Sequence, residues 1–240
     1  METNTNSASN PILKRLATRA MGLTGADIER IVRQARLKAR REKRALRFED
    51  LEAGIRMDRP AVPYDLRWRF AVHEAGHAIV HHILKLGPIH GINIDTANGG
   101  YSQLGFTASG SDTLGYLEDM LAMLMAGRAA EQIVVGRVSS GSGGSDDSDF
   151  ARATKLAVAM ERTLGFAAVH PLLYRHDKDQ GCVLDGNPDL SARVYARLET
   201  ALARAQEILR QNSSDLDALI GELFKMQSIS EEDVSRIITK

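Results

Sequence analysis

Apolar side chains return every three or four residues along most of this chain, and that spacing predicts a mainly α-helical protein. The clearest stripe lies in residues 189–211, where leucine, valine, isoleucine and alanine share one face of the expected helix. Thr24, followed three residues later by Asp27, predicts the start of another helix, because the two side chains can cap its first turn. The other segments with helical spacing are residues 48–55, 65–84, 114–135, 149–163, 214–224 and 230–238.

Two short segments depart from the helical period. Residues 89–94 and 101–107 flank Asn98-Gly99-Gly100, a sequence typical of turns, so they predict a small antiparallel hairpin. The expected fold class is therefore mainly α: a helical domain with a small antiparallel β-hairpin or sheet, preceded by a short helical segment.

Prolines divide the chain near residue 60, where Arg59-Pro60 interrupts the helical pattern. We expect residues 11–59 to form a short helical module and residues 60–240 to form the main domain. Residues 1–10, rich in Asn, Thr and Ser, are expected to be a disordered lead.

The composition is typical of a globular protein that buries a core. Of the 240 residues, 43% are hydrophobic and 26% are charged. Cys182 is the only cysteine, which excludes an intrachain disulfide and favours a reducing compartment. The sequence contains neither a signal-peptide pattern nor an apolar run of 18 residues, so we expect a soluble, cytoplasmic chain.

The net charge is zero, but its distribution is uneven. Between Ile12 and Arg47, 12 lysines and arginines stand against 3 acidic residues. Such a basic segment could bind nucleic acid through its phosphates. It has no aromatic residue for base stacking before Phe48, however, and helices commonly carry solvated charge. We therefore expect no nucleic-acid partner.

The sequence His73-Glu74-Ala75-Gly76-His77 lies in the middle of the expected helix 65–84. Residues four apart lie roughly 6 Å apart along a helix and on one face, so both imidazoles can reach one metal ion. This is the arrangement of zinc peptidases, in which the glutamate is the general base. The pattern also arises by chance on amphipathic helices. Gly76 speaks against chance, because a glycine inside a helix costs ~1 kcal/mol relative to alanine and indicates a close approach.

A catalytic zinc needs a third protein ligand and keeps its fourth position for water. His81 continues the spacing, but it lies ~12 Å along the helix from His73, too far for one ion. We expect His81 and His82 to be surface or packing residues. The remaining candidates are the carboxylates of Glu131, Asp146, Asp147 and Asp149.

Several segments together resemble the peptidase domain of the FtsH-type AAA+ zinc proteases. They are His73 to His77, Gly127-Arg128-Ala129-Ala130-Glu131 and Asp149-Phe150-Ala151-Arg152-Ala153-Thr154. The stretch Gly22 to Asp27 resembles the start of the ATPase lid helix, which implies that residues 11–59 are a lid remnant and residues 60–240 the zinc metallopeptidase domain. The resemblance covers nearly everything after Leu16.

The resemblance implies Zn²⁺ bound by His73, His77 and Asp149, with Glu74 taking a proton from the attacking water. It implies a metalloendopeptidase that hydrolyses unfolded or damaged proteins, as a homo-oligomer, hexameric in relatives. Glu131 would either orient a ligand or be a charge on the helix surface. An exposed edge of the hairpin, residues 89–107, could pair with an extended substrate.

The sequence also departs from that family. Asp146 and Asp147 stand in a loop longer than the usual Gly-Ala-Ser-Asn-Asp, so either could replace Asp149 as ligand. There is no Gly-x-x-x-x-Gly-Lys-Ser/Thr loop for phosphate and no membrane anchor. We therefore expect a truncated, split or degenerate relative whose AAA+ ATPase module is separate or missing. The alternative is a non-catalytic ring-assembly or adaptor module of an AAA+ protease.

Overall fold

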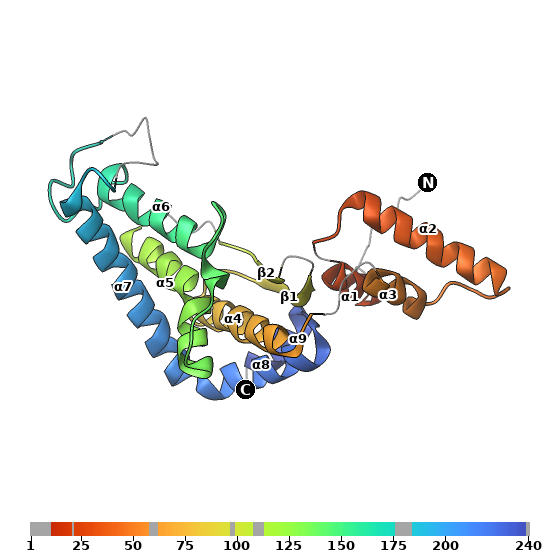
Figure 1. Cartoon of the computed structure of the whole chain (residues 1–240). Helices are drawn as coiled ribbons and strands as arrows, with labels where there is room; N and C mark the ends of the chain where they lie inside the picture. The colour runs from red at the N-terminus through yellow and green to blue at the C-terminus, as the bar shows by residue number, and fades with distance from the viewer. Residues whose placement is uncertain are drawn as a thin grey trace, which may run out of the picture. The chain divides into compact units, whose positions relative to one another are not determined.

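The computed structural model describes residues 11–20, 22–57, 62–96, 99–107, 113–175 and 184–238. They belong to two compact units. The first takes in the described parts of residues 1–74, 89–103 and 218–240, and the second those of residues 75–88 and 104–217. Most of the secondary structure is α-helix, with one small sheet in the first unit (Figure 1).

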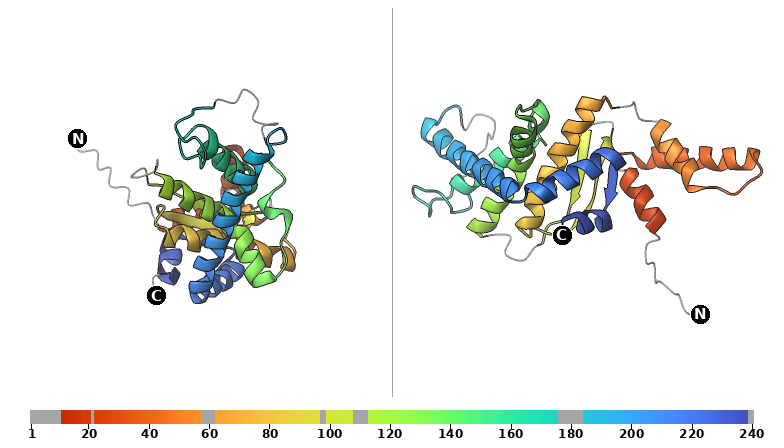
Figure 2. Two further views of the ribbon diagram at one scale, coloured as in Figure 1. Left: turned by 90° about the vertical axis from the view of Figure 1, so that its left-hand side faces the viewer. Right: turned by 90° about the horizontal axis from the view of Figure 1, so that it is seen from below.

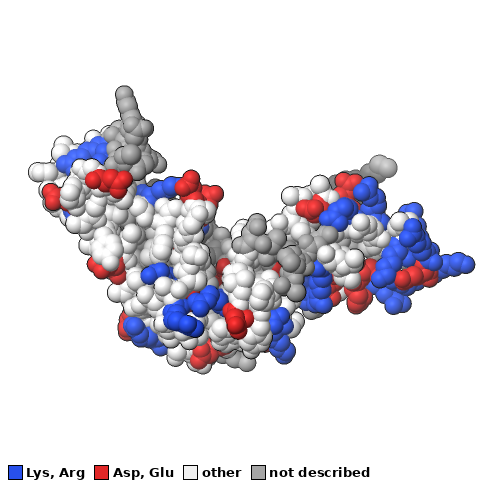
Figure 3. All heavy atoms as spheres, in the orientation of Figure 1, with Lys and Arg blue, Asp and Glu red and all other residues white. Residues whose placement is uncertain are grey.

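Three helices open the first unit: α1 (Pro11–Arg19), α2 (Gly25–Arg41) and α3 (Phe48–Met57). The expected cap of α2 is present. The Thr24 hydroxyl accepts from the Asp27 amide at 3.2 Å, and the Thr24 amide donates to the Asp27 carboxylate at 3.1 Å. The buried face of α2 consists of Ile31, Ala35 and Ala39. Its other faces carry the basic residues, and lysine and arginine gather over this part of the molecule in Figure 3.

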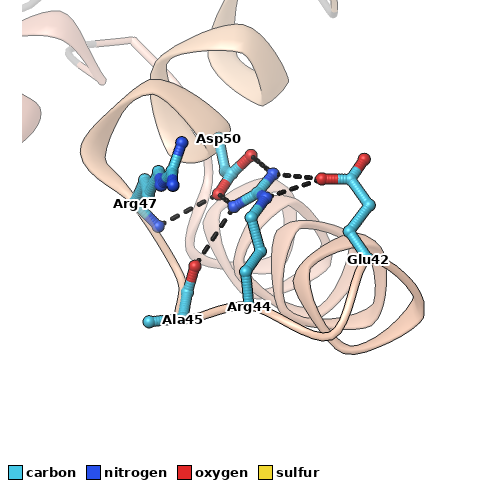
Figure 4. A network of polar contacts seen from close by, with 5 residues as sticks. All are labelled: Glu42, Arg44, Ala45, Arg47 and Asp50. Carbon is cyan, nitrogen blue, oxygen red and sulfur yellow. Dashed lines mark hydrogen bonds and ion pairs between the residues drawn. The ribbon is translucent and has the colours of Figure 1, made fainter.

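The link between α2 and α3 is held by Arg44 (Figure 4). Its guanidinium donates to both oxygens of Asp50, at 2.6 and 2.7 Å, and to Glu42 at 2.6 Å. The Arg47 amide also donates to Asp50, at 3.0 Å. These hydrogen bonds hold the pKa of the Asp50 carboxyl well below its usual range, and the bond from Arg44 has the largest effect. The basic segment is therefore partly a structural element of the α2–α3 turn.

The sheet of the first unit has the strand order β2-β1-β3. Strand β1 (Ile89–Thr96) is central, between β2 (Gly99–Leu104) and β3 (Ser228–Ser230). Strands β1 and β3 are antiparallel, with Ile92 opposite Ile229. Two residues connect β1 to β2, so these neighbours also run antiparallel. Helix α9 (Glu231–Ile238) packs against β1 and β3, and both views of Figure 2 keep it beside the strands.

Helix α4 (Tyr64–Ile83) continues from the first unit into the second. In the first unit Trp68 packs edge-on against Phe224 of helix α8 (Ser213–Met226), with ring centroids 5.4 Å apart. Between Ala71 and His81 most of the helix is buried. Its apolar residues without exposed surface are Ala71, Val72, Ala75, Ala78, Ile79 and Val80. Such burial suits a helix that carries a site in the interior of the protein.

The second unit is built on three mutually packed helices: α5 (Leu114–Ala130), α6 (Asp149–Arg162) and α7 (Pro188–Gln211) (Figure 1). Helix α5 runs on into a π-helical turn, η1 (Glu131–Val135), and a 3-10 turn, η2 (Ser140–Ser142), precedes α6. Helices α6 and α7 are joined by a buried ion cluster. In it Glu161 accepts from Arg193 at 2.9 Å and from Arg197 at 2.7 Å.

The expected fold class is confirmed, and the expected helices and the hairpin strands are present within a few residues. Two details differ. Strand β3 was not expected, and α4 begins at Tyr64, so that Asp65 lies in its first turn. Residues 1–10, the boundary at Arg59-Pro60, Asn98 and Cys182 lie outside the described residues. The division at residue 60 and the reducing compartment therefore stay predictions.

Within the described part of the chain, no helix combines the length and the apolar character that crossing a membrane requires.

Candidate metal centre

The structure brings together His73, His77 and Asp149. One potential ligand atom from each residue lies within 4.8 Å of the other two. Both histidines are on α4, one turn apart, so the helix fixes their spacing. Asp149 is the first residue of α6, 72 residues beyond His77.

Contacts within the second unit fix the imidazole of His77. Its Nε2 atom lies 3.2 Å from Oδ2 of Asp149, and its Nδ1 atom lies 2.9 Å from the carbonyl oxygen of Met123 on α5. A carbonyl oxygen only accepts hydrogen bonds, so Nδ1 carries a proton. In the neutral ring Nε2 is then unprotonated and presents its lone pair towards Asp149. The histidine is 6% exposed, and water screens this pair little.

Gly76 explains how α4 comes so close to α5. A Cβ atom at this position would lie 2.6 Å from the carbonyl oxygen of Ala126 and 2.6 Å from Cβ of Ala130. Neither atom can give way without moving the backbone of α5. The close approach expected from a glycine inside this helix is therefore real, and it seats the helical turn between the two histidines on α5.

Asp149 is held at the start of α6 by a local cap. The Ser148 hydroxyl accepts from the amide of Ala151 at 3.4 Å and begins the helix. Next along the chain, the ring of Phe150 lies against the guanidinium of Arg128 on α5, with 5.2 Å between the guanidinium carbon and the ring centroid. Asp146 and Asp147 are exposed in the preceding loop, and the metal-ligand grouping among the described residues contains neither. The geometry therefore favours Asp149.

Glu74 lies under strand β2 in the first unit. Its carboxylate accepts a hydrogen bond of 2.5 Å from the hydroxyl of Ser102, and the residue is 8% exposed. Gly100, two residues earlier on β2, leaves the space into which the Glu74 side chain extends. A largely buried carboxylate beside two potential metal ligands is a candidate general base.

Comparison with known proteins identifies the family to which this site belongs. Residues 64–237 match the profile of peptidase family M41. The chain belongs to this family.

The similarity of this M41 chain to individual family members extends beyond the residues that match the profile. The chain is 30% identical over 256 residues to the ATP-dependent zinc metalloprotease FtsH of Thermotoga maritima, a match that covers 95% of this chain and 41% of that protein. It is 33% identical over 248 residues to the ATP-dependent zinc metalloprotease FtsH of Pseudomonas putida, covering 92% of this chain and 39% of that protein. The chain thus spans about two fifths of the length of the curated relatives that it matches.

Glu131 of the M41 chain is 1% exposed, which excludes a charge on the helix surface. Its carboxylate accepts from the amide of Ser139 at 2.7 Å and from the Ser139 hydroxyl at 2.9 Å. A buried carboxylate needs such donors. Glu131 therefore ties the end of α5 to the loop that leads to α6 and Asp149.

His81 is a packing residue, as expected. It has no exposed surface, and its ring lies edge-on to Phe106 with centroids 5.2 Å apart. Burial lowers the pKa of His81 to about 4, because the protonated ring would lose its hydration. The imidazole is therefore neutral near pH 7.

Sequence reasoning missed two groups of the site in this M41 chain. Ser102 could have been suspected from the alternation along β2, where Gly100 and Ser102 share one face. The carbonyl of Met123 had no signal, because every residue carries a backbone carbonyl whatever its side chain.

Proposed function

We propose that this M41 chain is a zinc-dependent endopeptidase that hydrolyses unfolded polypeptides. The observation that carries the proposal is the approach of Oδ2 of Asp149 to Nε2 of His77, at 3.2 Å. His73 and His77, one turn apart on α4, complete a set of two imidazoles and one carboxylate. That donor set is typical of a catalytic zinc site with one position left for water.

The residues fit a metal ion on physical grounds. In the neutral tautomer that donates its Nδ1 proton to the Met123 carbonyl, Nε2 of His77 directs a lone pair at an acceptor oxygen of Asp149. Two acceptors at this distance repel each other unless a proton or a cation lies between them. Nitrogen and oxygen ligands of a tetrahedral zinc, each ~2.0–2.1 Å from the ion, lie roughly 3.3 Å apart. The separation of 3.2 Å matches that value.

Zinc, when bound, supplies a water of lowered pKa and polarises the scissile carbonyl. The chain's own residues do the rest. Asp149 and the two histidines hold the ion, and Met123 fixes which nitrogen of His77 is available. Glu74 accepts the proton of the attacking water on its carboxylate and later gives it to the leaving amine. This role needs Glu74 ionised before attack.

Strand β2 supports an extended polypeptide as substrate. It is an edge of the three-stranded sheet of the first unit, and the same strand contacts Glu74. An extended chain that pairs with a sheet edge gains backbone hydrogen bonds with little demand on its sequence. An unfolded chain offers such a strand along its whole length, whereas most backbone groups of a folded protein are already hydrogen-bonded. Unfolded proteins are therefore the proposed substrate class.

The relatives named above are described as ATP-dependent, whereas this sequence has no Gly-x-x-x-x-Gly-Lys-Ser/Thr loop. We infer that ATP-driven unfolding is supplied by an AAA+ module outside this sequence, in a homo-oligomeric assembly such as a hexamer. Helices α1–α3, of which α1 and α2 are basic, would be a lid remnant of such a module.

The decisive experiment compares zinc-loaded protein with its Glu74→Gln variant on a permanently unfolded polypeptide. Glu74→Gln should abolish cleavage and retain bound zinc, whereas Glu29→Gln, a change at an exposed position of α2, should retain both cleavage and bound zinc. A folded substrate should stay intact with every variant in the absence of an ATPase. Zinc binding without any cleavage by the unmodified chain would instead favour a non-catalytic assembly role.

A further inference from the structure

We infer that Ser102 is a positioning residue, whose hydroxyl fixes the carboxylate of Glu74 for proton transfer. The inference rests on the proposed function of Glu74 as general base and deepens it. It concerns a residue outside the set of two histidines, glutamate and aspartate, on a strand rather than on the metal-bearing helices.

The contact itself is short and occupies one carboxylate oxygen. Ser102 Oγ lies 2.5 Å from Oε2 of Glu74, at the short end for a hydroxyl that donates to an ionised carboxylate. Glu74 is 8% exposed, so bulk water has little access to compete for this position. A hydrogen bond to a charged acceptor is stronger than one between neutral groups, which makes this contact suitable for fixing a side chain.

Gly100 allows strand β2 to come within reach. A Cβ atom on Gly100 would lie 2.5 Å from Cγ of Glu74, 2.6 Å from Oε1 and 2.9 Å from Cδ. Any side chain at this position would therefore displace the glutamate. Gly100 and Ser102 are two residues apart and so lie on the same face of the strand. Tyr101, between them, lies on the opposite face and is 51% exposed.

Ser102 and Gly100 of β2 lie next to different oxygens of the Glu74 carboxylate. Ser102 holds Oε2, and the missing side chain of Gly100 leaves room for Oε1. A glutamate side chain has three rotatable bonds and would otherwise lose its orientation to thermal motion. With Oε2 engaged, Oε1 is the oxygen left to accept a proton. Correct orientation before reaction is a recognised source of rate enhancement.

The first test measures turnover. Ser102→Ala should lower kcat about tenfold with little change in KM or zinc content, because only the orientation of the base is lost. Ser102→Thr retains the hydroxyl and should restore most of kcat. Ser214→Ala, an exposed serine-to-alanine change on α8, is the matched control. If Ser102→Thr is as slow as Ser102→Ala, or if the loss lies entirely in zinc content, the inference is overturned.

The second test does not depend on activity or metal. Unfolding midpoints of the zinc-free protein are compared for Ser102→Ala, Glu74→Ala and the double variant. Ser102→Ala should lower the midpoint when Glu74 is present and have a much smaller effect in the Glu74→Ala background. Additive shifts would overturn the inference even if the chain proves to be a peptidase. Non-additive shifts in a chain without peptidase activity would support the fixing of Glu74 and overturn the proposed function.

Discussion

Nε2 of His77 faces Oδ2 of Asp149 at 3.2 Å, although 72 residues separate them in the sequence. The imidazole comes from the interior helix α4, and the carboxylate comes from the first residue of α6. Only the folded chain brings the two groups together, so zinc binding at the proposed site would be thermodynamically linked to folding.

Removal of the Asp149 carboxylate should abolish tight zinc binding. Asp149→Asn leaves two imidazoles without the third charged ligand, and we expect the affinity for zinc to fall about 100-fold or more. Equilibrium competition with a chromogenic chelator measures this. Asp146→Asn, in the exposed loop before α6, is the control and should bind zinc like the unmodified chain. If Asp146→Asn loses more zinc affinity than Asp149→Asn does, the assignment of the ligand to Asp149 is wrong.

Gly76→Ala should destabilise the protein, although alanine favours helix more than glycine does. The added Cβ would lie 2.6 Å from the Ala126 carbonyl oxygen, and overpacking of this kind costs about 1–3 kcal/mol. Urea unfolding gives the change in free energy. Gly221→Ala is the matched control, because nothing lies within 4 Å of its Cβ position on α8, and it should stabilise by about 0.5–1 kcal/mol. Equal effects at the two positions would contradict the close packing of α4 on α5.

His81 should make stability depend on pH below neutrality. Burial lowers its pKa to about 4, whereas the unfolded chain has a value of about 6.5. Between these values the unfolded state binds a proton that the folded state does not, so stability falls as pH drops from 6.5 to 4. His81→Leu should flatten the urea midpoint over this interval relative to the unmodified chain.

Glu161→Gln should loosen the packing of α7 on α6. The carboxylate is 1% exposed and pairs with Arg193 and Arg197, so its removal leaves two partly buried guanidinium groups without a counter-charge. Breaking such a cluster costs about 3 kcal/mol. Thermal or urea unfolding measures the change. Glu207→Gln, at an exposed position of α7, should stay within about 0.5 kcal/mol of the unmodified chain.

The sequence predicted the long helices because their apolar spacing persists over several turns, as in α7. It could not predict β3, because the three residues Ser228–Ser230 are too few to show alternation. They form a strand only because β1 lies beside them. The repeated apolar spacing along the sequence was therefore enough to predict the long helices. Strand β3 depends on its pairing with β1.

The candidate site shows the same division. The spacing of His73 and His77 follows from helix geometry, so the sequence alone predicted that they share a face. The choice among Asp146, Asp147 and Asp149 remained open in the spacing, because a loop rich in glycine and serine has no fixed direction. In the folded chain the cap at Ser148 and the contact of Phe150 with Arg128 hold the start of α6, and the resulting geometry favours Asp149.

The hydrogen bond between His77 and the carbonyl of Met123 would couple zinc binding at the proposed site to the backbone of another helix. When α5 frays at that turn, the imidazole loses the partner that fixes its tautomer. If the intact helix α5 increases the affinity for a cation, a bound cation stabilises the intact helix by the same free energy. Amide hydrogens around Met123 should therefore exchange with deuterium more slowly as the zinc concentration rises, so that the backbone of α5 would report on the occupancy of the proposed zinc site.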